Sequence, residues 1–159
     1  MKALGCLLIV LGAGAFCLFR ESEEARLLAW GDAMLSDLSR LRREVCAVRR
    51  PLPQILETAL CPAPLTGRAW QALLLGLDED GEMAWERFER AVPSCFAPAL
   101  MPLGSHLAAG GEDLARAIDE TREELASHLH RERSERVQRT KLRCALSFSA
   151  AALVMLVLI

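Results

Sequence analysis

Histidine, cysteine and serine are the side chains best suited to metal or nucleophilic chemistry, and this sequence does not bring them together in recognisable motifs. His128 and His130 are two residues apart, so on a helix they point to different faces and do not pair on a metal ion as i, i+4 histidines do. We expect both to be solvated. His106 lies in an apolar, glycine-broken stretch, which favours a packing or helix-capping role. These patterns predict no metal site.

Other catalytic motifs are also missing from the sequence. Ser94 and Cys95 have neither the GxSxG context of a nucleophile elbow nor an identifiable base. Lys2 and Lys141 are the only lysines, and neither follows a glycine-rich phosphate loop. We therefore expect a protein that is not an enzyme and that binds no cofactor. A membrane enzyme whose site has no sequence motif is kept as a minor alternative.

Two runs of charge are the candidate contact surfaces. The first is an acidic turn with a net charge of −4 over residues 78–82, and its acidic residues are Asp78, Glu79, Asp80 and Glu82. Its spacing does not fit a calcium loop, and the turn would suit a basic partner. The second is a basic stretch with a net charge of +4 over residues 131–143, and its basic residues are Arg131, Arg133, Arg136, Arg139, Lys141 and Arg143. Lipid headgroups or a protein partner would both suit this stretch.

The whole-chain composition argues against a nucleic-acid partner. The formal net charge is −2 and aromatic residues make up 5% of the chain, with no tyrosine. A nucleic-acid-binding domain is expected to carry a basic excess, and single-strand binders add aromatic side chains on which bases stack. The chain has neither feature.

Charge is confined to the middle of the chain. Apart from Lys2, every charged side chain lies within residues 20–143, whereas residues 3–19 and 144–159 carry none. At ~1.5 Å per residue each uncharged run covers roughly 25 Å of a ~30 Å hydrocarbon core. Snorkelling basic side chains at the flanks would extend their reach. The sequence predicts a membrane helix at 1–19, a helical domain at 20–143 and a second membrane helix at 144–159.

Basic residues also predict the orientation of this arrangement. The middle segment carries 18 of the 19 lysines and arginines, so the positive-inside rule places it in the cytoplasm. Cys46, Cys61 and Cys95 would then be reduced thiols. The alternative is a cleaved signal peptide, because Lys2 precedes an apolar run and residues 13–15 read Ala-Gly-Ala. The mature chain would then be a secreted or surface helical protein with oxidised cysteines and a C-terminal membrane tail.

The middle segment has the periodicity of helices, with no strand-like alternation of useful length. Its clearest signal is a seam at alternating spacings of four and three residues, formed by Leu27, Gly31, Met34, Leu38, Leu41, Val45 and Val48. Pro51 and Pro53 would end that helix. A second apolar face, formed by Leu114, Ile118, Leu125 and Leu129 with Thr121 at the missing step, would pack against the seam.

Shorter helices are expected between these two faces. A helix at 53–60 precedes a proline turn, and Thr66 would N-cap a helix that carries Trp70. The next helix would carry the apolar residues Met83, Trp85, Phe88 and Val92. The apolar stretch 96–107 reads as a helix broken by Pro98, Pro102 and Gly104. The expected class is all-α, a helical bundle between N- and C-terminal membrane helices.

Four sequence blocks, in order, resemble the stage III sporulation protein AB family of endospore-forming bacteria. The first has the form LxxLxxEVxxxxxPLPQIL and contains Leu38, Leu41, Glu44, Val45, Pro51, Leu52, Pro53, Ile55 and Leu56. The second is Ala84 with Trp85, the third is Leu103-Gly104 with Leu107, and the last is the closing KLRCALSFSAAALVMLVLI. The chain departs from the family after the turn at 110–111, where Asp113 and Ala117 replace an expected Asp followed by Gln.

The resemblance implies a role in the channel that links mother cell and forespore during engulfment. The family's soluble part is similar to the cytoplasmic domains of the type II secretion inner-membrane platform protein. By this resemblance the chain would sit in the mother-cell membrane and couple a secretion-type ATPase, the AA member, to the other channel components. Its partners would be that ATPase, those components and membrane lipids. Whether it forms a homo-oligomer is left open.

Overall fold

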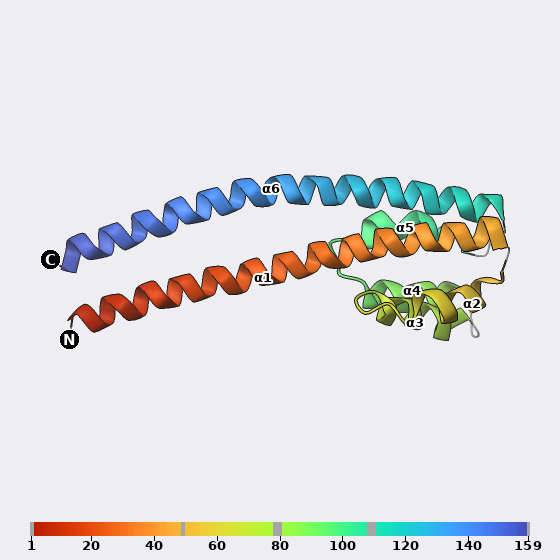
Figure 1. The fold of residues 1–159 in the computed structure, drawn as a ribbon, viewed down its shortest axis with the longest axis horizontal. Coiled ribbons are helices and arrows are strands. Elements are labelled where there is room, and N and C mark those ends of the chain that lie inside the picture. The colour runs from red at the N-terminus through yellow and green to blue at the C-terminus, as the bar shows by residue number, and fades with distance from the viewer. Residues whose placement is uncertain (1, 49, 78–80, 108–110, 159) are drawn as a thin grey trace. The chain divides into compact units, whose positions relative to one another are not determined.

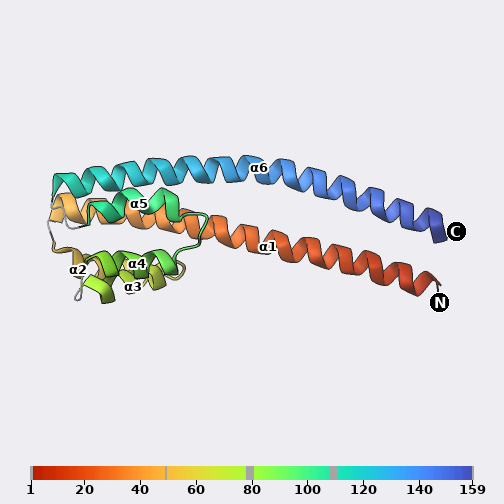
Figure 2. The same ribbon diagram turned by 180° about the vertical axis from the view of Figure 1, so that it is seen from behind.

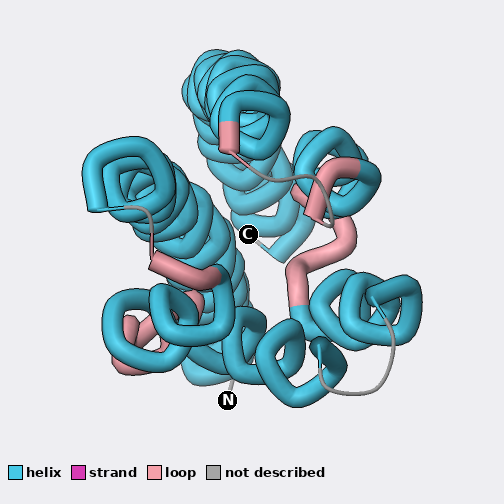
Figure 3. The backbone as a smooth tube through the Cα atoms, turned by 90° about the vertical axis from the view of Figure 1, so that its right-hand side faces the viewer, coloured by secondary structure: helices cyan, strands magenta, loops and turns pink. Residues whose placement is uncertain are grey.

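The computed structural model describes residues 2–48, 50–77, 81–107 and 111–158, and these residues form helices and connecting turns with no strand (Figures 1 and 3). The all-α class predicted from the sequence is thus confirmed. The helices are α1 (Lys2–Arg43), α2 (Leu52–Ile55), α3 (Gly67–Leu77), α4 (Gly81–Ala91), α5 (Ala97–Ser105) and α6 (Glu112–Leu158). Two π-helical turns, Glu44–Val48 and Leu56–Leu60, follow α1 and α2.

The chain divides into two compact units, which are described separately. One unit, residues 28–130, is a helical bundle built from the end of α1, the beginning of α6 and all helices between them. We call it the bundle unit. The other consists of residues 1–27 and 131–159, the outer parts of α1 and α6, and we call it the two-helix unit.

The middle of the predicted α1 seam packs against the predicted face of α6 inside the bundle unit, whereas Leu27 at the beginning of the seam is 41% exposed. Met34, Leu38 and Leu41 are at most 1% exposed. The whole α6 face is buried as well, at Leu114, Ile118, Thr121, Leu125 and Leu129. A Cβ atom added at Gly31 would lie 2.6 Å from Leu129 Cδ2, so the glycine allows the two helices to approach closely there. Figures 1 and 2 show α5 lying beside these two helices.

Thr121 is a polar side chain within this otherwise apolar face, and its Oγ1 is buried without a hydrogen-bond partner. We expect Thr121→Val to raise the free energy of unfolding by about 1 kcal/mol, because valine keeps the shape and removes an unsatisfied group. Thermal melting of both proteins measures the difference. Thr58→Val is the matched control, since the Thr58 hydroxyl is exposed and already donates to the Gln54 carbonyl at 2.7 Å. Equal effects of the two substitutions would contradict the prediction.

Helices α3 and α4 form a tight antiparallel pair in the bundle unit. A Cβ atom at Gly76 would lie 2.3 Å from the Ala84 Cα, so the two backbones meet at this glycine. The pair is filled by aromatic rings, with the Phe88 centroid 5.2 Å from that of Trp70 and 4.9 Å from that of Trp85. Trp85 also covers Gly104 of α5, where a Cβ would approach the indole to 2.4 Å.

Three details of the bundle unit differ from the sequence-based predictions. Helix α5 is continuous through Pro102. Proline has no N–H to bond to the carbonyl of Pro98, four residues earlier, but Pro98 is exposed, so water can bond to that carbonyl instead. Met83 is 47% exposed, because Ala84 takes the inward position against Gly76. Thr66 does precede α3, but its hydroxyl donates to the Asp37 carboxylate.

The two-helix unit contains the antiparallel ends of α1 and α6, with both chain termini at the same end of the unit (Figures 1 and 2). Both predicted membrane segments are therefore helical over their described residues. In the portion of the chain that the structure describes, no helix combines the length and apolarity needed to cross a membrane. Membrane insertion of the two ends stays a prediction.

Candidate functional site

The basic stretch predicted from the sequence lies on α6, in the two-helix unit. Arg136 is its most enclosed described residue. Its Nη2 donates to the Glu21 backbone carbonyl at 3.1 Å, and its guanidinium lies 3.9 Å from the carboxylates of both Glu21 and Glu24. Arg139 is paired with Glu135, one turn earlier on the same helix. Acidic side chains therefore offset the charges of Arg136 and Arg139.

The remaining basic residues do not add up to a single charged face. Arg131 and Arg133 are exposed, whereas Lys141 and Arg143 lie in α6 with side chains outside the described set. At 100° per residue, the four described arginines are spread over roughly 200° of the helix circumference. The described arginines therefore do not form one stripe along a single side of α6.

The acidic turn falls mostly outside the described residues. Asp78, Glu79 and Asp80 are not described, and Glu82 lies in the first turn of α4 with its side chain undescribed. Close by, Leu75 of α3 is 67% exposed and Met83 of α4 is 47% exposed. The acidic turn therefore stays a predicted surface, and the structure places exposed apolar side chains near it.

The described histidine and cysteine residues considered for metal or nucleophilic chemistry do not gather at one site. Across the described ranges, no three His, Cys, Asp or Glu side chains are grouped so that they could hold a metal ion. Cys46, Cys61 and Cys95 are not joined in disulfide bonds. The expectation that His128 is solvated is wrong, because its ring is half-buried and meets Phe96 edge-on with centroids 5.7 Å apart.

Cys61 is expected to react more slowly with thiol reagents than Cys46 and Cys95. Burial, and secondarily the nearby Glu57 carboxylate, raise the pKa of the Cys61 thiol. The reactive thiolate is therefore a smaller fraction at neutral pH, and its share grows as the pH rises toward the raised pKa. Alkylation of the full chain at pH 7 and pH 9, followed by mass spectrometry of each cysteine peptide, measures the three rates. A Cys61 rate equal to that of Cys46 at pH 7 would contradict this.

Asp37 is a buried polar site that the sequence analysis missed. It is 9% exposed, and its Oδ2 accepts hydrogen bonds from the Thr66 hydroxyl and, at 2.9 Å, from Trp70 Nε1. Thr66 and Trp70 are fully buried, so this carboxylate joins α1 to the beginning of α3. Its spacing was a usable signal, because Asp37 stands three residues after Met34 and four before Leu41 and thus on the seam.

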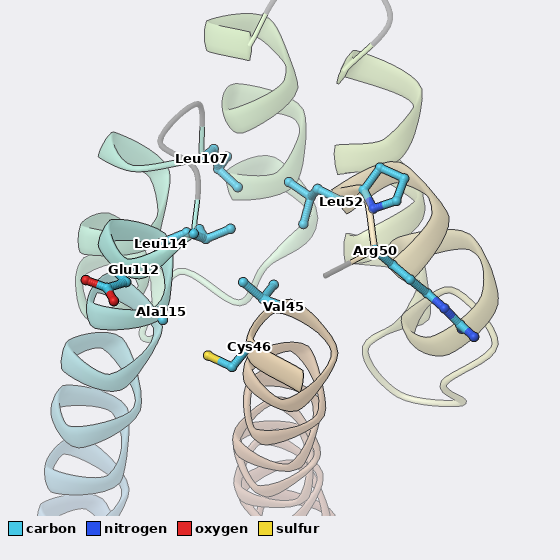
Figure 4. Close-up of a pocket in the computed structure, with 10 residues that line it drawn as sticks. Val45, Cys46, Arg50, Leu52, Leu107, Glu112, Leu114 and Ala115 are labelled. Carbon is cyan, nitrogen blue, oxygen red and sulfur yellow. The ribbon is translucent and has the colours of Figure 1, made fainter. Parts of the chain in front are cut away.

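A pocket of about 650 Å³ opens in the bundle unit, where the π-helical turn after α1 meets the beginning of α6 (Figure 4). Four aliphatic side chains from separate segments converge on it: Val45, Leu52, Leu107 and Leu114. Arg50 and Glu112 line it on opposite sides, and Figure 4 shows both charged groups directed away from the centre. Nothing in the sequence marked this pocket, because its lining comes from three separate parts of the chain.

Comparison of the chain with models of protein families, with curated proteins and with solved structures found no match. The resemblance to the sporulation family therefore rests on the residues quoted for it. Among those residues, Trp85 and Gly104 belong to different sequence blocks and pack together in the fold.

Proposed function

We propose that the protein is a non-enzymatic membrane platform of the mother-cell–forespore sporulation channel, which couples a cytoplasmic secretion-type ATPase to the other channel components. In this role its two ends insert in the mother-cell membrane, and residues 20–143 face the cytoplasm. The protein performs no chemical step. It holds a helical surface at a fixed place where an ATPase can dock and transmit force.

The course of α1 and α6 is the observation that supports the membrane-anchored part of the proposal, whereas the channel and its ATPase rest on the sequence resemblance. Each helix continues without a break into a run that has no charged side chain, residues 3–19 in α1 and residues 144–158 in α6. Both termini lie at one end of the two-helix unit, as two helices entering the same membrane require (Figure 2). The basic residues at 131–143 stand beside the second uncharged run, where anionic headgroups attract them by ~1 kcal/mol each.

Co-purification from sporulating cells tests the proposed role. The chain, tagged in its bundle unit, is solubilised in mild detergent and examined for the AA-type ATPase. Recovery of the ATPase supports a coupling platform. Recovery of other channel components without the ATPase would make the protein a structural link, and recovery of none would refute the family assignment.

Thiol labelling in intact cells separates this proposal from a secreted or surface protein. Cys46 and Cys95 are exposed in the fold, so an impermeant maleimide would modify both if the bundle unit were outside the cell. The platform proposal expects labelling only after the membrane is permeabilised. Labelling of intact cells, or disulfides among these cysteines, would exclude the cytoplasmic orientation.

A further inference from the structure

The pocket beside the π-helical turn is lined by aliphatic side chains together with a few polar ones, and no described segment of the bundle unit fills it. Val45, Leu52 and Leu114 point into it, and at about 650 Å³ it is large enough for several aliphatic side chains. Leu114 is already buried, whereas Val45, Leu52 and Leu107 are partly exposed, so covering their remaining apolar surface would be favourable by about 25 cal/mol per Å². This part of the bundle unit is therefore suited to an apolar occupant.

The position of the charged residues indicates what kind of occupant would fit. Pockets for small molecules usually place a few polar groups inside, where they orient the ligand. Here the charged lining residues, Arg50 and Glu112, stand on opposite rims and point outward (Figure 4). The Arg50 side chain is 49% exposed and forms an ion pair with Glu44 at 3.9 Å, which is longer than a hydrogen bond, so a closer acidic group could compete with Glu44 for it. An occupant that engages both rims must cross the whole mouth, as a polypeptide segment does.

We propose that this pocket docks a segment of a partner protein, which inserts two or three aliphatic side chains between an acidic residue at Arg50 and a basic residue at Glu112. An amphipathic helix, whose apolar anchors repeat every three to four residues, meets this description. The π-helical turn Glu44–Val48 supports the assignment, because such turns are frequent at functional sites. This inference rests on the proposed platform function, in which the docked partner is the ATPase.

Photo-crosslinking in sporulating cells tests the proposed dock. A photoreactive amino acid replaces Arg116, which is exposed and adjacent to the pocket-lining Ala115, and the matched control replaces the exposed Gln71 of α3. We expect the ATPase to be crosslinked from position 116 and about tenfold less from position 71. Filling the pocket with Ala115→Phe should lower the yield from 116 by about tenfold. The same change on the exposed side of α6, Ala126→Phe, should leave the yield unchanged.

Charge reversal tests the orientation of the segment. Arg50→Glu and Glu112→Arg should each weaken crosslinking several-fold, whereas Arg68→Glu, an exposed reversal on α3, should not. Circular dichroism of each variant shows whether the bundle unit still folds.

The outcomes distinguish failure of the dock from failure of the platform function. If the ATPase co-purifies but Ala115→Phe leaves its crosslink unchanged, the dock is wrong and the platform function stands. If the ATPase is absent but another channel component is crosslinked from 116 and lost with Ala115→Phe, the dock stands and the ATPase-coupling role is wrong. If no protein is crosslinked from position 116, or if Ala115→Phe leaves every such crosslink unchanged, the proposed docking site is wrong.

Discussion

Asp37→Ala is expected to lower the free energy of unfolding by about 3–5 kcal/mol. The substitution removes the oxygen that accepts hydrogen bonds from Thr66 Oγ1 and Trp70 Nε1. Both donors are fully buried, so water cannot replace the carboxylate without opening the contact between α1 and α3. Urea unfolding of the full chain in detergent micelles, followed by tryptophan fluorescence, measures the loss.

Two further variants show whether the loss comes from unsatisfied donors. Asp37→Asn keeps one acceptor oxygen and should cost less than Asp37→Ala. Adding Thr66→Val to Asp37→Ala should recover about 1 kcal/mol, because it removes one of the two orphaned donors. A double variant that is less stable than Asp37→Ala alone would show that Thr66 contributes through packing, and the hydrogen-bond explanation would be wrong.

The sequence predicted the helices of this fold well because their apolar faces repeat at helical spacing. The seam at Met34, Leu38 and Leu41 and the opposing face on α6 are buried as expected. Those faces had to pack against each other because each is a long apolar stripe with no other partner of similar length. The helix boundaries at Pro51 and Gly111 were also predictable. Proline disfavours a helical conformation in the residue before it, and glycine readily adopts a positive φ, which is +63° at Gly111.

Features that depend on contacts between distant segments were not predictable in this way. The spacing of Asp37 from Met34 and Leu41 indicates its place beside the seam, but its hydrogen-bond partners were not predictable, because Thr66 and Trp70 lie 29 and 33 residues further along the chain. Arg136 stands four residues after Glu132, a spacing that favours an ion pair within a helix. It contacts Glu21 and Glu24 of α1, because the antiparallel helix places these residues beside it.

The candidate sites show the same limit. Charge runs are visible in a sequence, but their value as surfaces depends on which charges already have partners. Arg136 and Arg139 have acidic partners in the two-helix unit. The rim charges of the pocket, Arg50 and Glu112, stand 62 residues apart in the sequence and belong to no charge run. The pocket is thus a product of the fold, and it joins the basic stretch and acidic turn as a candidate contact surface.

Gly76→Val is expected to lower the free energy of unfolding by about 3 kcal/mol or more. The Cβ of any residue at position 76 would come 2.3 Å from the Ala84 Cα and 2.9 Å from its backbone nitrogen. Backbone atoms in a helix cannot rotate away as a side-chain end can, so α3 and α4 must separate. Separation would also disturb the ring contact between Trp70 and Phe88, which lies between the same two helices.

Gln71→Val, on the exposed side of α3, is the matched control because it introduces the same β-branched residue without a facing backbone. It should cost less than about 0.7 kcal/mol, which is the helix propensity effect alone. Gly76→Ala should fall between the two, since its single Cβ still meets Ala84 but alanine gains about 1 kcal/mol of helix propensity over glycine. Urea unfolding gives all three values. Equal losses for the two valine variants would mean that α3 and α4 do not meet at Gly76.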